Sequence, residues 1–118
     1  MSRPGAWKAA RLSVLAAESA DPDRFTRGRR AQRDGAVGAL SISEGSVETQ
    51  VQGSTAEPYT VVLRWAPSYR PGEVPARHEV APRCSCPDAT PWCKHAVAVL
   101  LALADHVGAD PDLLDDWR

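Results

Sequence analysis

The sequence lacks the features of membrane, secreted and disulfide-rich proteins. No apolar run approaches the roughly 20 residues of a membrane-spanning helix. The N-terminal segment M-S-R-P-G-A-W-K has no apolar stretch of the kind found in secretion signals. There are only three cysteines, and an odd number argues against a disulfide framework. We therefore expect a cytoplasmic protein with reduced thiols and no membrane partner.

A strong overall charge is also missing. The 118 residues carry a net charge of -1, with 43% hydrophobic and 25% charged residues, which suits one globular domain. The charge is unevenly spread. Residues 1–34 hold eight basic and four acidic side chains, whereas the rest of the chain holds six basic and eleven acidic ones. A contact with nucleic acid would therefore have to be local rather than spread over the whole protein.

All three cysteines fall in one short run, C-S-C-P-D-A-T-P-W-C-K-H, which ends in a histidine. The candidate ligands are Cys84, Cys86, Cys93 and His95. Thiolate and imidazole bind Zn2+ strongly, and four such ligands complete a tetrahedral structural site. The spacing therefore predicts one structural Zn2+. Arg83 and Lys94 adjoin ligands and either offset the negative charge of the zinc thiolates or are solvated surface charges.

Two alternatives to a zinc site fit the sequence less well. A Cys/His nucleophile pair is disfavoured because Cys93 and His95 are two residues apart and would not face each other on a helix. The other alternative is three buried cysteines beside an unrelated histidine.

A closed metal shell leaves no open position for a substrate, and the sequence has no phosphate-cradling glycine loop. We therefore expect no catalytic activity and no small-molecule substrate.

Periodicity and turn residues predict an α+β fold with a small antiparallel sheet of three to four strands. The predicted helices cover residues 6–20, residues 22–32 after the cap Asp21, a stretch from the second ligand pair to Gly108, and a short segment after Asp110-Pro111. The predicted strands cover residues 37–43, 47–52, 59–65 and, as a short fourth one, 77–82. A turn is expected at Glu44-Gly45, and a loop over residues 66–75.

The cysteine run, with its C-x-C, six residues and C-x-H spacing, resembles the SWIM zinc finger. Cys86-Pro87 and Cys93-Lys94-His95 carry the resemblance, together with the alanine-, valine- and leucine-rich helix that follows them. The upstream sequences R-F-T-R-G-R-R, D-G-A-V-G-A-L-S-I-S, V-Q-G-S and P-Y-T-V-V-L-R-W are similar to those of bacterial members. The resemblance extends over roughly residues 24–105.

This resemblance implies a ββα zinc module. Two ligands, Cys84 and Cys86, would approach the metal from the sheet side, and Cys93 and His95 would lie at the start of the helix. The implied organisation is an N-terminal helical segment at 1–34, a SWIM-type domain at 35–107 and a short C-terminal helix at 108–118, all in one compact unit. The family also implies a DNA-binding or protein-interaction module, which in bacteria is associated with Swi/Snf-type helicase ATPases.

An arginine-rich helix is the candidate contact surface for phosphate. Its basic side chains are Arg24, Arg27, Arg29, Arg30 and Arg33. Arginine suits bidentate phosphate recognition, and spacings of three and four residues place these side chains on neighbouring stripes. The alternative is a solvated face that pairs with Asp21, Asp23 and the acidic C-terminus, and the low overall charge favours it.

Apolar residues in the two terminal helices are the candidate contact surface for a protein partner. They are Trp7, Leu113 and Trp117. The alternative is that the two helices pack on each other and on the sheet, and we expect this packing for most of their apolar surface, with one edge left for a partner. Trp92 is expected to pack over the metal loop rather than to bind a partner. Two functions follow as expectations. The first is an adaptor that docks on a larger nucleic-acid-processing machine such as a helicase-like ATPase. The second is direct, weakly specific DNA or RNA binding through the arginine-rich helix.

Overall fold

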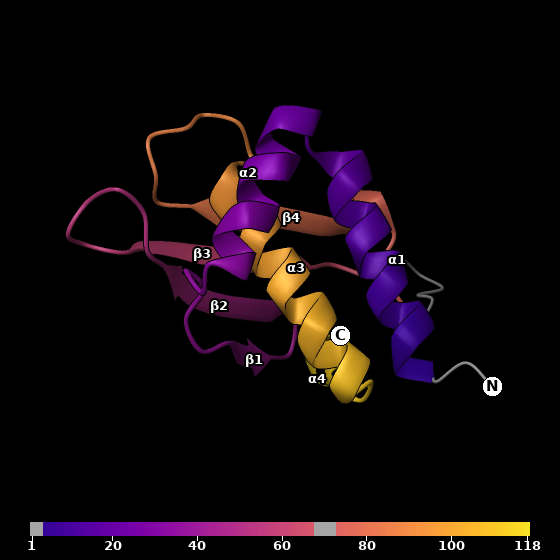
Figure 1. Ribbon diagram of the computed structural model, residues 1–118. Helices are drawn as coiled ribbons and strands as arrows, with labels where there is room; N and C mark the ends of the chain where they lie inside the picture. Colours follow the sequence, from indigo (N-terminus) through magenta and orange to yellow (C-terminus); the bar gives the residue numbers. More distant parts are fainter. Residues whose placement is uncertain (1–3, 68–72) are drawn as a thin grey trace.

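A four-stranded antiparallel sheet with helices packed on one face forms the protein (Figure 1). The computed structural model describes residues 4–67 and 73–118. Its elements are α1 (Pro4–Ser19), α2 (Pro22–Arg33), β1 (Ser41–Ser43), β2 (Ser46–Val51), β3 (Tyr59–Trp65), the 3-10 turn η1 (Arg77–Glu79), β4 (Val80–Cys84), α3 (Lys94–Ala109) and α4 (Leu113–Trp117). The predicted α+β class is confirmed. No helix among the described residues has the length and apolar character needed to span a membrane.

The sheet follows the order of the chain, β1-β2-β3-β4, with every neighbouring pair antiparallel. Strand alternation separates its two faces, because Val47, Val51 and Leu63 are buried under the helices whereas Glu48 and Arg64 are exposed. The predicted turn at Glu44-Gly45 joins β1 to β2. Gly45 has φ 79°, a left-handed conformation that glycine adopts without steric cost.

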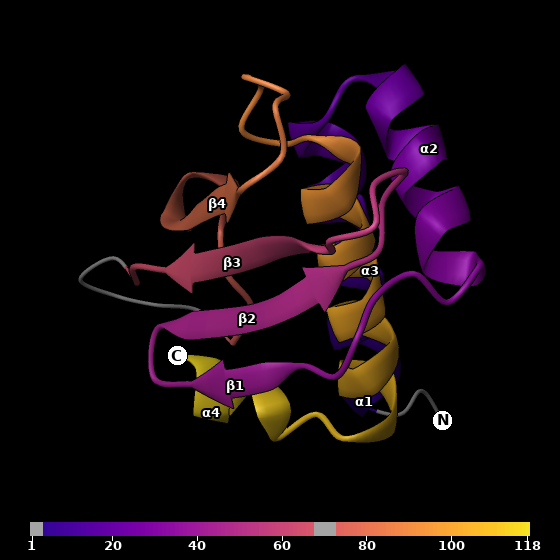
Figure 2. The same cartoon turned by 90° about the vertical axis from the view of Figure 1, so that its left-hand side faces the viewer.

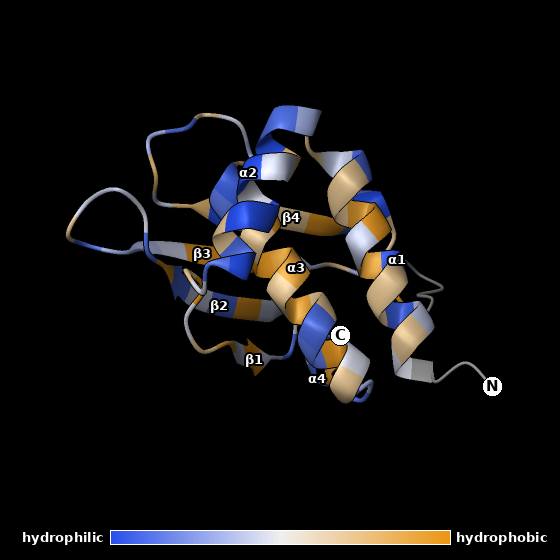
Figure 3. Cartoon of the chain, in the orientation of Figure 1, coloured by the Kyte–Doolittle hydropathy of each residue, from blue (hydrophilic) through white to orange (hydrophobic). Residues whose placement is uncertain are grey.

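Helix α3 is the centre of the core and lies against the sheet, α1 and α2 (Figures 1 and 2). Every residue from His95 to Ala104 is buried, which agrees with the apolar character that the sequence shows on more than one face of this segment. Figure 3 shows α3 mainly in the hydrophobic colours over this stretch, whereas α2 is largely hydrophilic. Helix α2 therefore covers α3 with one narrow side and faces solvent with the other.

Individual residues explain where α2 starts and why it lies close to α3. Asp21 caps the helix by accepting a hydrogen bond from the Arg24 backbone N–H at 2.9 Å, and Pro22 occupies the first position, as predicted. Gly28 lets the two helices meet. A Cβ atom at Gly28 would lie 2.7 Å from the Lys94 carbonyl oxygen and 2.6 Å from the Cβ of Val97. The arginine-rich helix is thereby held against the first turn of α3.

Two strand boundaries differ from the prediction. Residues 37–43 do not form one continuous strand, since Ser41–Ser43 pairs with β2 as β1 and Val37 makes only an isolated bridge to Val51. Between them, the Thr49 hydroxyl donates to the Ala39 carbonyl at 2.8 Å in place of a ladder bond. The fourth strand starts at Val80 rather than at residue 77, because the preceding residues form the turn η1. Within the predicted loop 66–75, residues 68–72 lie outside the described part of the chain, as do residues 1–3 of the N-terminal segment.

Candidate metal centre

The four predicted ligands come together between the end of β4 and the start of α3. Cys84 is the last residue of β4, Cys93 caps α3, and His95 lies in the first turn of that helix. With Cys86 from the intervening loop, their ligand atoms all lie within 4.8 Å of one another. The implied arrangement, with two ligands from the sheet side and two from the helix start, is what the structure shows.

The loop that carries the ligands is fixed at both of its ends. Ser85 continues the pairing with β3, since its N–H donates to the Thr60 carbonyl at 3.0 Å and its hydroxyl accepts from the Thr60 N–H at 2.9 Å. Trp92 is buried with 9% of its surface exposed, as expected for packing over the metal loop. The ligands are therefore held in position by the sheet and by the core.

The thiols form one hydrogen-bonded group. The Cys84 thiol donates to Cys93, which lowers the pKa of Cys93 and raises that of Cys84. Hydrogen bonds from His95 and from the Ala96 backbone N–H also lower the pKa of Cys93, at the positive end of α3. A negative charge is therefore favoured at Cys93, where a cation can replace the shared protons.

The donor set fits zinc. Zinc–sulfur bonds of about 2.3 Å and zinc–nitrogen bonds of about 2.0 Å place sulfur and nitrogen about 3.6 Å apart in a tetrahedron. The Sγ of Cys84 and the Nδ1 of His95 lie 3.7 Å apart. Three sulfur donors and one nitrogen donor make a closed Cys3His shell for one structural Zn2+. This ion would join the sheet to α3.

Comparison with known proteins agrees with this geometry. Residues 59–104, which run from β3 through the ligand loop into α3, match the family model described as SWIM zinc finger. The chain carries a SWIM zinc finger. It is also 27% identical, over a 150-residue alignment, to the uncharacterized protein Rv2102 of Mycobacterium tuberculosis. That alignment covers 95% of this chain and 54% of Rv2102, so the chain spans about half the length of this relative. No solved structure matches the present chain.

Arg24 fastens α2 to the ligand loop of the SWIM finger. Its Nε lies 2.8 Å and its Nη2 3.1 Å from the two carboxylate oxygens of Asp88, and its Nη1 lies 2.6 Å from Asp21. The Arg24 guanidinium lowers the pKa of Asp88 to about 2. The prediction that Arg24 contacts phosphate is therefore corrected, because two carboxylates occupy its guanidinium. Asp88 was not singled out in the sequence, since nothing local links residues 64 positions apart.

The remaining arginines of α2 face solvent. Arg27 pairs with Asp23 at 3.2 Å, but the two side chains are 62% and 71% exposed, and such pairs contribute little. Arg29, Arg30 and Arg33 are exposed, and none of them makes an ion pair with another residue of the described chain. The predicted pairing of α2 with Asp21 and Asp23 thus holds for two arginines. Pairing with the acidic C-terminus is not seen in the described part.

The predicted protein-contact residues divide into buried and exposed ones. Trp117 is fully buried, its Nε1–H donates to the Leu63 carbonyl at 3.2 Å, and its ring centre lies 5.2 Å from that of Trp65. The prediction that Trp117 contacts a partner is therefore wrong, because its ring fills the core. Leu113 is half-buried against the same core. Trp7 is 43% exposed on α1, so its partner contact stays a prediction.

Proposed function

We propose that the protein is a zinc-stabilised interaction module that binds nucleic acid with little sequence specificity. The observation that carries this proposal is the set of exposed arginines on α2, which we call the arginine face. It consists of Arg27, Arg29, Arg30 and Arg33. Three of them have no ion-pair partner in the described structure, so their guanidinium groups are available to phosphate without first breaking a salt bridge.

The arginine face is presented on a helix that is held in place. The Arg24–Asp88 pair fixes the first turn of α2 to the ligand loop, and Gly28 packs directly on α3. A held helix keeps the spacing of its guanidinium groups when phosphate binds, so less side-chain and backbone entropy is lost. Arginines that contact only the phosphates of DNA or RNA do not read the bases, so their binding carries no sequence information.

The proposal assigns no catalytic step to this chain. The Cys3His set leaves no open coordination position at which zinc could activate water or a substrate. Any catalysis in the surrounding machine would then belong to a partner, for which a helicase-like ATPase is the candidate class. Within the proposal, zinc has the structural role of ordering the ligand loop and α3.

Removing two arginines tests the proposal. The double variant Arg29→Gln and Arg33→Gln should weaken binding to duplex DNA of every sequence alike. It should also flatten the plot of log affinity against log salt by about 1.8, or about 0.9 per lost phosphate contact. Fluorescence anisotropy with a labelled duplex over a salt series measures both effects. Arg64→Gln is the matched control, because Arg64 is exposed on the opposite face of the sheet. Wild-type protein that fails to bind even at low salt would contradict the proposal.

An adaptor role is the second candidate, favoured by one surface. Trp7 and Val14 are both 43% exposed, and a separation of seven residues places them on the same side of α1. Exposed tryptophan is a frequent anchor at protein interfaces. In this candidate the SWIM finger docks through α1 on a larger machine such as a helicase-like ATPase.

Trp7→Ala tests the adaptor candidate. Because Trp7 is exposed at the surface, its truncation should change the free energy of unfolding by less than about 1 kcal/mol and leave the zinc content unchanged. Affinity capture from the native cell, followed by mass spectrometry, should recover a helicase-like ATPase with the wild type and with Arg64→Gln but not with Trp7→Ala. Equal recovery with all three proteins would remove α1 as the docking surface.

A further inference from the structure

A groove between α2 and the zinc centre gathers cationic side chains from two helices. Its volume is ≈ 520 Å³. We call it the cationic groove, and its charged lining residues are Arg27, Arg30, Asp34 and Lys94. Gln52, Gly53 and Ser54, from the connection between β2 and β3, form another wall. Three cations therefore face one carboxylate, and the groove favours an anion.

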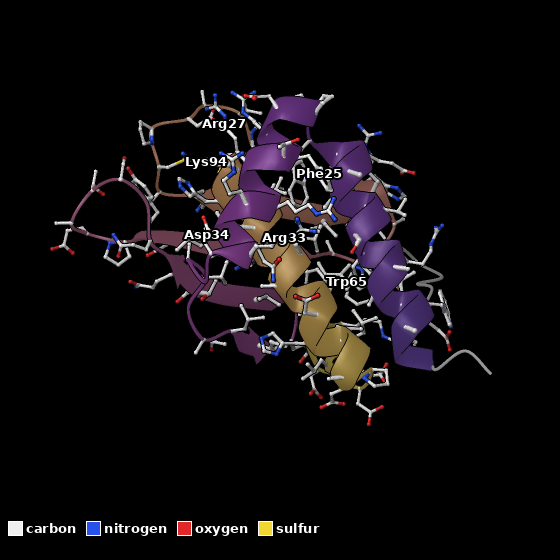
Figure 4. The ribbon with its side chains drawn as sticks, in the orientation of Figure 1. Phe25, Arg27, Arg33, Asp34, Trp65 and Lys94 are labelled. Carbon is white, nitrogen blue, oxygen red and sulfur yellow. The ribbon has the colours of Figure 1, made fainter. Side chains whose placement is uncertain are left out.

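The position of Lys94 is set by the metal centre. Lys94 lies between the ligands Cys93 and His95, and it is the first residue of α3. It makes no ion pair with any side chain in residues 4–67 or 73–118. Figure 4 shows Lys94 and Arg27 on neighbouring parts of α3 and α2, and both side chains line the cationic groove and a second cavity of ≈ 320 Å³ beside the zinc ligands.

A buried ring nitrogen without a hydrogen-bond partner belongs to His95, which lines the groove. His95 is 5% exposed, and its Nδ1 faces the thiols. Its other ring nitrogen, Nε2, has no hydrogen-bond partner among the described residues and lies beneath Gly53, where a Cβ atom would be 3.5 Å from it. When Nδ1 binds the metal, Nε2 carries the ring proton. This N–H is then a hydrogen-bond donor, and such donors normally have an acceptor. An anion bound in the groove would supply that acceptor, directly or through one water.

We propose that the cationic groove seats a backbone phosphate of a nucleic acid between Lys94 on one side and Arg30 and Arg27 on the other. This inference rests on the proposed function, and it assigns one phosphate to a defined part of the surface. Arg30 also lines a neighbouring hollow with Arg29 and Arg33, so the groove continues into the arginine face. A polymer with regularly spaced phosphates engages both regions at once, whereas a free phosphate engages only the groove.

The test is an NMR titration of the zinc-loaded, nitrogen-15-labelled chain with three probes at one ionic strength. The probes are a single-stranded ten-nucleotide thymidine oligomer, inorganic phosphate and polyglutamate. The oligomer should shift the amide signals of Gly53, Ser54 and Lys94 together with the side-chain Nε signal of Arg30. Inorganic phosphate should shift the same signals only at much higher concentration, and polyglutamate should bind more weakly than the oligomer.

Two single variants measure the contribution of the groove. Lys94→Gln and Arg30→Gln should each lower the affinity for the oligomer about three- to tenfold and reduce its salt slope by about 0.7. Arg64→Gln should bind like the wild type. Because Lys94 adjoins two zinc ligands, the Lys94→Gln variant must still bind one zinc and keep the NMR spectrum of the folded wild type. Arg30→Gln lies outside the ligand loop and tests the groove without this complication.

The possible outcomes separate the groove from the proposed function. If the oligomer shifts the signals of Arg29 and Arg33 but not those of residues 53, 54 and 94, and Lys94→Gln binds normally, the groove is overturned and the arginine face stands. If the oligomer shifts nothing, both proposals fall. Equal affinity for inorganic phosphate and the oligomer would overturn nucleic acid as the source of the phosphate. Tighter binding of polyglutamate would identify an acidic protein segment instead.

Discussion

Replacing Cys93 by serine is expected to remove zinc and to unfold the C-terminal half of the chain. Cys93 is buried, caps α3 and favours the negative charge within the thiol group. A serine hydroxyl does not ionise near neutral pH and is a poor zinc ligand, so the tetrahedral shell would be broken. Structural zinc contributes on the order of 10 kcal/mol to the folding of small zinc modules, which exceeds the typical stability of a whole domain.

Two measurements on the same samples check this expectation. Elemental analysis should give one zinc per wild-type chain and none for Cys93→Ser, and circular dichroism should show loss of helix in the variant. Ala89→Ser is the matched control, since it introduces the same residue type at an exposed position of the same loop. The structural role of zinc would be disproved if wild-type protein purified without chelator held no zinc. A serine variant that melted like the wild type would disprove it equally.

Local signals in the sequence account for much of the fold and for the metal ligands. The zinc set spans only residues 84–95, so the chain has few ways to arrange it other than around one ion. The cap at Asp21 and the glycine turn at Gly45 each act within four residues, and both appear in the structure as predicted. Strand alternation in β2 and β3 likewise gives the buried face correctly, because period two is a property of the extended backbone itself.

The features that the sequence did not reveal depend on contacts between distant segments. The pairing of Arg24 with Asp88 was not predicted, because Asp88 follows 64 residues later in the ligand loop. The shortened β1 has a similar cause, since a hydroxyl on β2 competes for its backbone carbonyl. The partner contact predicted for Trp117 was wrong for the same reason, because the sequence does not show that its ring packs on Trp65. A short helix with three apolar residues has the same pattern whether that side faces the core or a partner.

The cationic groove depends both on local sequence spacing and on contacts between distant segments. Local spacing places Lys94 between two zinc ligands, but only the tight packing at Gly28 brings α2 close enough for Arg27 to line the same cavities. The zinc ligands and the cationic groove therefore share the first turn of α3. If nucleic acid binds more tightly to the zinc-loaded chain, it should raise the affinity of the chain for zinc by the same factor, because coupling between the binding free energies of two sites is reciprocal.

Replacing Trp117 by alanine is expected to cost about 3–5 kcal/mol of unfolding free energy, the range for truncation of a buried aromatic residue. The indole is fully buried, packs on Trp65 and donates a hydrogen bond to the Leu63 carbonyl, which the variant would leave without this donor. The Trp117 carbonyl also accepts from the Gly45 N–H at 2.6 Å, so α4 is tied to the turn between β1 and β2.

Urea denaturation of the zinc-loaded proteins measures this cost, and two further variants divide it into parts. Trp117→Phe keeps an aromatic ring but loses the donor, so it should lose about 1–3 kcal/mol less than alanine does. Leu113→Ala, in the same helix but only half-buried, should cost less than Trp117→Ala, because less apolar surface is lost. If Trp117→Ala instead lost under about 1 kcal/mol and kept its zinc, the indole would behave as a surface residue. The C-terminal helix would then return as a docking surface for a partner, beside the exposed tryptophan of α1.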